Sequence, residues 1–288
     1  MYSIIRTIIL GLGIFSANTN FALASEAVSP KAYHLWTIPG IDLPITNSMI
    51  TSWVMSLFLI IGIRIAIGGK PKLIPNTGQA VVESIVIGIQ NMIEPIVGKR
   101  MVKPTFPLLV GLFTFILMHN WSGLIPGVGT FGHYDEHGHL LYYFRPGSSD
   151  LNLTLALSIV SFVSWIYYII RYAGFKTIAY DLFGNKADKK EVPQIAYYFL
   201  FIIFFGVGII ELISIAFRLV SLSFRLFGNI FGGENLLTSI TGIFSYILPV
   251  PFYFLEILIG LIQALVFTLL TAIYIGLICN HGEEEHGH

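Results

Sequence analysis

The sequence predicts an all-α integral membrane protein with five transmembrane helices and one amphipathic helix at the membrane interface. Of its 288 residues, 55% are hydrophobic and only 11% are charged, whereas soluble domains carry roughly 25% charged residues. Several apolar stretches are long enough to cross a bilayer, since a spanning helix needs about 20 residues. The net charge of zero also argues against a nucleic-acid partner.

A single membrane domain is expected over residues 46–280. The fourth and fifth apolar stretches exceed an upright crossing: residues 194–224 alone extend about 46 Å at about 1.5 Å per residue, against a hydrocarbon core of about 30 Å. Both are therefore expected to tilt strongly and to present a long edge to a neighbouring protein. The expected spans are residues 49–67, 106–125, 151–172, 194–237 and 251–280.

Residues 78–97 are expected to form the amphipathic helix, because apolar residues recur at near-helical spacing and polar residues gather on another side, as in helices that lie along the interface. The apolar positions are Val81, Ile85, Ile89 and Met92, and the polar positions are Glu83, Gln90 and Glu94.

The two ends of the chain are predicted to lie outside the membrane domain. Residues 1–24 have the features of a secretory signal peptide, with Arg6 before an apolar stretch and a small-residue cleavage site at Ala22–Ala24. An uncleaved anchoring helix is the alternative. Residues 25–45 are expected to be an outer tail and residues 281–288 a polar cytoplasmic tail.

Lys and Arg residues predict the orientation, because cytoplasmic loops are enriched in them. They fall almost entirely on one alternating set of loops, which places the N-terminus outside and the C-terminus in the cytoplasm. This agrees with a secretory signal and suits a bacterial inner membrane, with a plastid thylakoid membrane as the alternative. The cytoplasmic set is Arg64, Lys70, Lys72, Lys99, Arg100, Lys103, Arg171, Lys176, Lys186, Lys189 and Lys190, and the outer set is Lys31 and Arg145.

Arg225 is the most unusual residue, because it stands inside an apolar span. A guanidinium stays charged, and at a membrane centre it costs roughly 2.5–3.5 kcal/mol. A functional role is therefore expected, with a pair to a carboxylate of the same chain as the alternative. Glu211, Arg218 and Asn229 share its helical stripe, and Arg218 is expected to neutralise Glu211 or to lie near an inner water path. Glu234 points to roughly the opposite side.

These residues carry a resemblance to subunit a of F-type ATP synthases. The stretch Ser223-Phe224-Arg225-Leu226-Phe227-Gly228-Asn229, with Gly233-Glu234 after it, is similar to the arginine signature of that family. Further matches are Gln263-Ala264, Asn120-Trp121-Ser122-Gly123-Leu124-Ile125-Pro126, Asp150-Leu151-Asn152 and Glu211.

The resemblance implies an ion-channel subunit that stands beside a rotating ring of c subunits. Two offset half-channels would conduct protons to and from the ring carboxylates, with Arg225 facing the ring as the separating charge. Further implied partners are b-type peripheral stalk subunits, the rest of the ATP synthase complex and the lipid bilayer. The subunit is essential but binds no nucleotide, is no enzyme by itself and needs no cofactor or metal. The implied proton-path residues are Glu234, Glu256, Gln263, Asn229, Glu211, Asp150, Asn152 and Asn120.

Helix geometry adds an expectation about two carboxylates. If Arg225 faces the level of Gln263 in an antiparallel pair, Glu234 lies opposite position 254, less than a turn from Glu256 and about 13 Å outward from Arg225. We hypothesise that Glu234 and Glu256 relay protons in the outer half-channel, because two carboxylates so close do not both ionise cheaply. The alternative is that each is a helix-end residue whose carboxyl reaches water.

Four of the polar residues also suit structural roles. Gln263 and Asn229 suit interhelical hydrogen bonds, and Asp150 and Asn152 suit helix caps. The histidines of the loop 126–149 fit no compact zinc site. A sodium-translocating version of the same subunit is one alternative function, and a self-contained secondary transporter is a second, although no inverted repeat is visible.

Overall fold

The computed structural model describes residues 32–38, 42–125, 128, 132–134, 140–172, 174, 194–243 and 247–284. Within this part of the chain, six helices are long and apolar enough to cross a membrane. The prediction of an all-α membrane protein is confirmed, whereas the number of helices that cross stays a prediction. The helices are α2 (Asn47–Ile67), α3 (Thr77–Val97), α4 (Lys99–Ser122), α5 (Leu151–Tyr172), α7 (Gln194–Ile243) and α8 (Pro249–Glu284).

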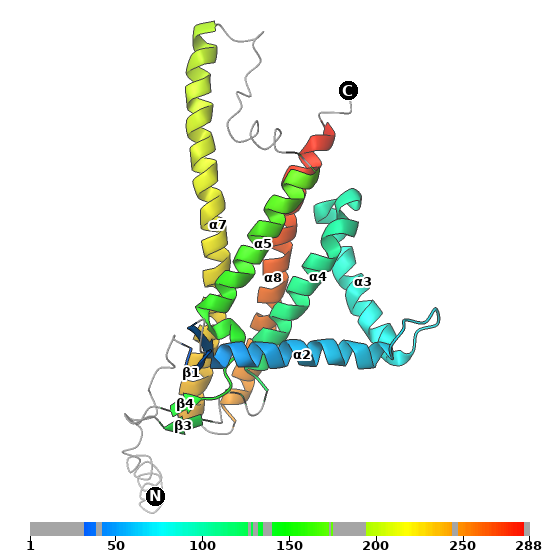
Figure 1. Cartoon of the computed structure of the whole chain (residues 1–288), viewed down its shortest axis with the longest axis vertical. Coiled ribbons are helices and arrows are strands. Elements are labelled where there is room, and N and C mark those ends of the chain that lie inside the picture. The colour runs from blue at the N-terminus through cyan, green and yellow to red at the C-terminus, as the bar shows by residue number, and fades with distance from the viewer. Residues whose placement is uncertain are drawn as a thin grey trace, which may run out of the picture.

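Figure 1 shows how these helices are arranged. The helices α4, α5 and α8 slope in the same direction, α2 runs crosswise to them, and α7 diverges from α8 toward its N-terminal end. With 50 residues, α7 is about 75 Å long at about 1.5 Å per residue, more than twice a hydrocarbon core of about 30 Å. A helix of this length cannot stand upright inside a bilayer, which supports the expected tilt.

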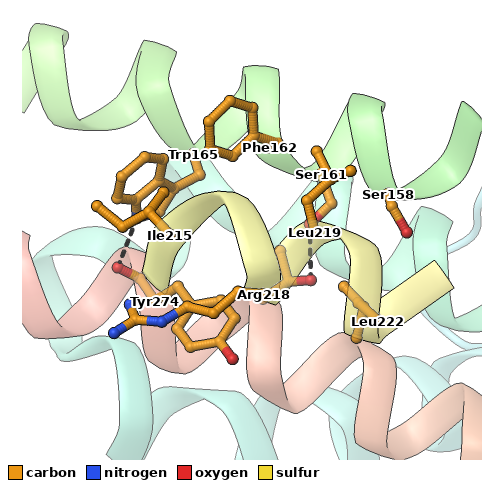
Figure 2. A pocket seen from close by; sticks show the side chains of 10 residues that line it. Ser158, Ser161, Phe162, Trp165, Ile215, Arg218, Leu219, Leu222 and Tyr274 are labelled. Atoms are coloured by element: carbon orange, nitrogen blue, oxygen red, sulfur yellow. Dashed lines mark hydrogen bonds between the residues drawn. The ribbon is translucent and has the colours of Figure 1, made fainter. Parts of the chain in front are cut away.

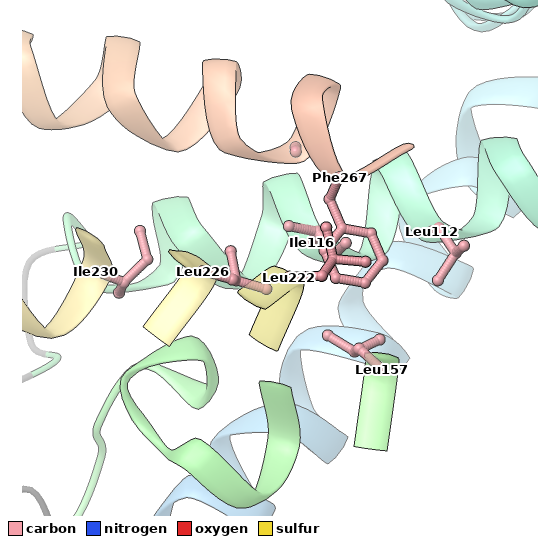
Figure 3. Packing of buried hydrophobic residues seen from close by; sticks show 8 residues of the cluster. Leu112, Ile116, Leu157, Leu222, Leu226, Ile230 and Phe267 are labelled. Carbon is pink, nitrogen blue, oxygen red and sulfur yellow. The ribbon is translucent and has the colours of Figure 1, made fainter. Parts of the chain in front are cut away.

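The main core lies where α4, α5, α7 and α8 meet (Figure 3). The residues that α7 contributes to this core are Leu222, Leu226 and Ile230, which recur every fourth position and therefore share one side of the helix. They pack with Ile116 of α4 and Phe267 of α8. This packing decides which side of α7 faces the bundle and which side faces away from it.

A second core cluster joins α3 to α4 and α8. It buries Ile89, Ile93 and Val97 of α3, while Val81 and Ile85 are exposed. These five residues recur every fourth position, so one side of α3 is exposed over its first half and buried against α4 and α8 over its second half. The assignment of this helix to the interface stays a prediction.

Three helix ends differ from the expected bounds by four residues or more. The helix α4 begins at Lys99, before the apolar run from residue 106, because charged residues form its first turns. The helix α7 continues past residue 237 to Ile243, and α8 continues into the expected polar tail, to Glu284. The expected bounds followed the apolar runs, whereas the helices continue into polar residues beyond those runs.

Two β-hairpins, which the sequence analysis did not predict, lie outside the helices. The strands β1 (His34–Ile38) and β2 (Leu43–Thr46) pair antiparallel, as do β3 (Gly132–Tyr134) and β4 (Leu140–Tyr142). A 3₁₀ turn, η2 (Gly147–Ser149), leads into α5.

Several predictions concern residues outside the described part of the chain. They are the signal peptide 1–24, parts of the outer tail 25–45 and of the histidine-containing loop 126–149, and the tail beyond residue 284.

Candidate functional site

Arg225 lies on α7 with its side chain exposed, although its neighbour Leu226 is buried in the core. Within the described residues, the guanidinium makes no hydrogen bond or ion pair. Asn229, one turn further along α7, is exposed as well. Arg225 therefore projects away from the bundle, and no described carboxylate of its own chain pairs with it.

Arg218, two turns before Arg225, has two partners in the chain. Its Nη2 atom lies 3.5 Å from Oε1 of Glu211, and its Cζ atom lies 5.1 Å from the centroid of the Tyr274 ring. Figure 2 shows the guanidinium beside this ring. The expected pairing of Arg218 with Glu211 is present, and both side chains are exposed.

Two cavities surround Arg218. The larger, of about 250 Å³, is lined by both Arg218 and Arg225 together with Ser214 and Ser221. The smaller, of about 30 Å³, lies among α5, α7 and α8 (Figure 2). The hydroxyl of Ser158 there is buried without a partner in the described part of the chain. We call the larger one the inner cavity, because it lies on the N-terminal side of Arg225 along α7, the side that the Lys and Arg pattern predicts to be cytoplasmic.

Glu234 forms a buried ion pair with Arg145, which lies between β4 and η2. The Nε and Nη2 atoms of Arg145 both donate to Oε2 of Glu234, at 3.3 and 3.2 Å. The side chain of Arg145 is 4% exposed and that of Glu234 is 15% exposed. The charge of Glu234 is thus compensated within the chain.

Glu256 lies on α8 and faces α7, with 6% of its surface exposed. Its carboxyl group lies against Gly233, where a β-carbon would overlap it. No hydrogen bond or ion pair of Glu256 occurs among the described residues. The structure therefore places Glu256 beside Gly233, next to Glu234 in the chain. This is close to the register expected between the last two helices.

Glu234 and Glu256 line one cavity of about 350 Å³, which we call the outer cavity. Asn120 of α4 lines it too and donates from Nδ2 to the carbonyl of Gly260, 2.9 Å away. Its Oδ1 atom is buried without a partner in the described part of the chain. Further polar lining comes from Thr238, Thr241 and Tyr253.

Asp150 caps α5 and connects it to α2. Its Oδ1 atom accepts hydrogen bonds from the backbone N–H and the side-chain amide of Asn152, at 3.0 and 3.1 Å. Its Oδ2 atom accepts a 2.5 Å hydrogen bond from Ser48 of α2. Neither Asp150 nor Asn152 lines the inner or the outer cavity. The geometry favours the cap interpretation over a place in a proton path.

The structure does not bring every expected residue together. Gln263 on α8 is half-buried and lines neither the inner nor the outer cavity. Sequence reasoning also missed Arg145 as a site residue, having used it only for the orientation. The signal that could have found it was a cation in an outer loop otherwise poor in Lys and Arg.

A model of the ATP synthase A chain family matches residues 49–276. The chain belongs to this family. The family resemblance inferred from the motif around Arg225 is thereby confirmed.

Curated members of the ATP synthase A chain family agree with this assignment over most of their length. ATP synthase subunit a of Geotalea daltonii is 32% identical over 256 residues, which cover 88% of this chain and 95% of the relative. That of Moorella thermoacetica is 31% identical, with 85% and 94% covered, and that of Gloeobacter violaceus is 32% identical, with 83% and 86% covered. As a family member, the chain is a multi-pass, ion-translocating subunit of an ATP synthase.

Proposed function

We propose that the chain is the stationary proton channel beside a ring of c subunits. Protons would reach the ring carboxylates through one half-channel and leave through another, and Arg225 would separate the two. Proton flow then turns the ring and drives ATP synthesis elsewhere in the complex. The chain itself binds no nucleotide and catalyses no reaction.

The exposed, unpaired Arg225 carries this proposal. A membrane-embedded guanidinium without a counter-charge is costly, and no described residue of this chain supplies one. A carboxylate on a neighbouring chain would remove that cost. The attraction would favour the ionised form of a passing ring carboxylate, and Arg itself cannot lose its proton in a protein.

The two cavities support the half-channels. The outer cavity holds Glu234, Glu256 and Asn120, and the inner cavity reaches Arg225 from the side of Arg218. Along α7, Arg225 and Glu234 are separated by about 13 Å at about 1.5 Å per residue. The two openings are thus offset, as separated entry and exit paths require. Glu211 belongs to the inner path in this scheme, and Asn229 and Gln263 flank the ring-facing charge.

We place the protein in a bacterial inner membrane, with the N-terminus outside. The distribution of Lys and Arg supports this orientation, because the outer cavity lies beside the cation-poor loop that contains Arg145. The b-type stalk subunits would hold the chain stationary against the ring.

The proton is proposed as the transported ion, because the cavities contain carboxyl groups that exchange protons. ATP-driven pumping with and without sodium, in the presence of a protonophore, tests this assignment. Sodium uptake that persists with the protonophore present would contradict it.

Replacing Arg225 in the whole, assembled synthase tests the proposed function. Vesicles that contain Arg225→Ala should show no ATP-driven acidification, a loss of at least about a hundredfold, because the ring carboxylate loses its counter-charge. The Arg225→Lys variant should pump at a reduced rate or not at all, since an ammonium cannot replace the planar guanidinium.

Arg171→Gln is the matched control, because Arg171 is exposed at the end of α5 and lies outside both cavities. It should pump within about twofold of the unmodified complex, as surface substitutions usually have small effects. Normal pumping by an assembled Arg225→Ala complex would overturn the proposal.

A further inference from the structure

The outer cavity contains two carboxyl groups in different surroundings. Glu234 has a guanidinium partner at 3.2 Å, whereas Glu256 has no ion pair within the described residues. Both line the same cavity. The two carboxyl groups are therefore subject to different electrostatic constraints, which suit them to different tasks.

Arg145 contacts Glu234 through two donors on one oxygen. Its Nε and Nη2 atoms lie 3.3 and 3.2 Å from Oε2 of Glu234, and the guanidinium is almost entirely buried. Charge-assisted hydrogen bonds of this kind are stronger than neutral ones. A proton that binds Glu234 would have to weaken this ion pair, which is costly where the guanidinium is buried.

Contacts with two helices hold Arg145 in place. Its backbone N–H donates to Oγ1 of Thr51 on α2, at 3.2 Å, and its Cζ atom lies 5.8 Å from the centroid of the Phe231 ring on α7. The position of the guanidinium is thus fixed by α2, by the Phe231 ring and by the segment before η2. The guanidinium of Arg145 is therefore a fixed counter-charge for Glu234 of α7.

Glu256 has no such constraint. Its carboxyl group lies at the cavity beside Gly233, and a proton that binds there breaks no ion pair among the described residues. Asn120, whose Oδ1 atom is buried without a partner in the described part of the chain, is among the residues that line the same cavity.

We propose that Arg145 is a positioning residue that holds Glu234 as a fixed, ionised carboxylate, so that Glu256 is the group that takes up and releases protons in the outer cavity. Glu234 then supplies a constant charge beside the path, instead of acting as an equal partner in a relay. This inference rests on the proposed function, because it requires the outer cavity to be a proton path.

Pumping by the whole synthase in vesicles, normalised to the amount of assembled complex, tests this division of tasks. Arg145→Gln should lower the rate about tenfold or more, since it leaves the buried charge of Glu234 unpaired. The double variant with Glu234→Gln should pump at least about threefold faster than Arg145→Gln, because it removes the carboxylate charge that Arg145→Gln leaves unpaired. Arg145→Lys should retain more activity than Arg145→Gln, since it keeps the cation.

Arg171→Gln is the control for loss of one positive charge, and it should pump normally. A merely structural Arg145 would not be rescued by Glu234→Gln, so a double variant no faster than Arg145→Gln overturns the inference. If Arg145→Gln does not assemble, recovery of assembled complex in the double variant supports the inference, and its absence overturns it.

Glu256→Gln separates this inference from the proposed function. It should reduce pumping by at least about fiftyfold, because it removes the proton-carrying group. Normal pumping by Glu256→Gln would overturn the proton-carrying task assigned to Glu256, whereas the proposed function is overturned by normal pumping in Arg225→Ala. Loss of pumping in Glu256→Gln, combined with normal pumping in Arg145→Gln, would leave the path intact and overturn only the task assigned to Arg145.

Discussion

The carboxyl group of Glu256 lies against Gly233, at a place where the β-carbon of any other residue would overlap it. Gly233 is a buried residue of the helix α7, so the glycine is needed there for space. The contact lets α8 bring Glu256 to the outer cavity that Glu234 also lines. The geometry of this cavity thus depends on a residue without a functional group.

A methyl group at position 233 should displace the carboxyl group of Glu256. The end of a Glu side chain can turn away, so Gly233→Ala should assemble but place the carboxyl group wrongly. We expect ATP-driven pumping to fall about tenfold, because small displacements of a reacting group are costly. Gly206→Ala on the same helix is the matched control, since nothing lies within 4 Å of its β-carbon. Equal pumping by the two variants would contradict this account of the contact.

Ile116 is fully buried in the core cluster of α4, α5, α7 and α8. Ile116→Ala should leave a cavity and destabilise the packing by roughly 2–5 kcal/mol. Heating the purified complex and following its loss of ATP-driven pumping measures the effect as a lower midpoint temperature. Ile85→Ala on the exposed side of α3 removes the same atoms and should leave the midpoint nearly unchanged. Identical midpoints for both variants would refute the assigned core.

Asp150 is predicted to act through stability. Asp150→Ala removes the cap of α5 and the acceptor for Ser48, and loss of a cap alone costs about 1 kcal/mol. We expect a lower midpoint of thermal inactivation, with pumping per assembled complex within about twofold of normal. Asp150→Asn keeps an acceptor at the cap and should be milder. A loss of pumping at unchanged thermal stability would instead place Asp150 in the proton path.

The helices could be predicted from the sequence because long apolar runs have few alternatives in a membrane. The span 151–172 coincides with α5. The helix α7 extends past the expected end at residue 237, because Thr238 and Thr241 are polar but compatible with a helix. The hairpin of β1 and β2 was missed, because its strands are only 5 and 4 residues long and one of them contains Pro44. Strands this short show no clear alternation of apolar and polar residues.

The site could be predicted in part. Helical spacing separates Arg225 from the buried Leu226, and antiparallel geometry places Glu256 near Glu234. The ion pair between Arg145 and Glu234 was not predictable, because Arg145 belongs to an irregular segment 89 residues earlier in the chain. Helical periodicity predicts contacts within one helix or one antiparallel pair of helices. It does not predict a contact between a loop residue and a helix.

The central claim is that the Arg225 side of α7 faces another chain. A photoreactive amino acid at Phe224, which is exposed beside Arg225, tests it in the assembled synthase. Phe267, which is buried in the core, is the matched control position. We expect illumination to join position 224 to the small hydrophobic ring subunit and position 267 to no other chain. Failure of position 224 to crosslink to the ring subunit, in a complex that pumps protons, would contradict the account.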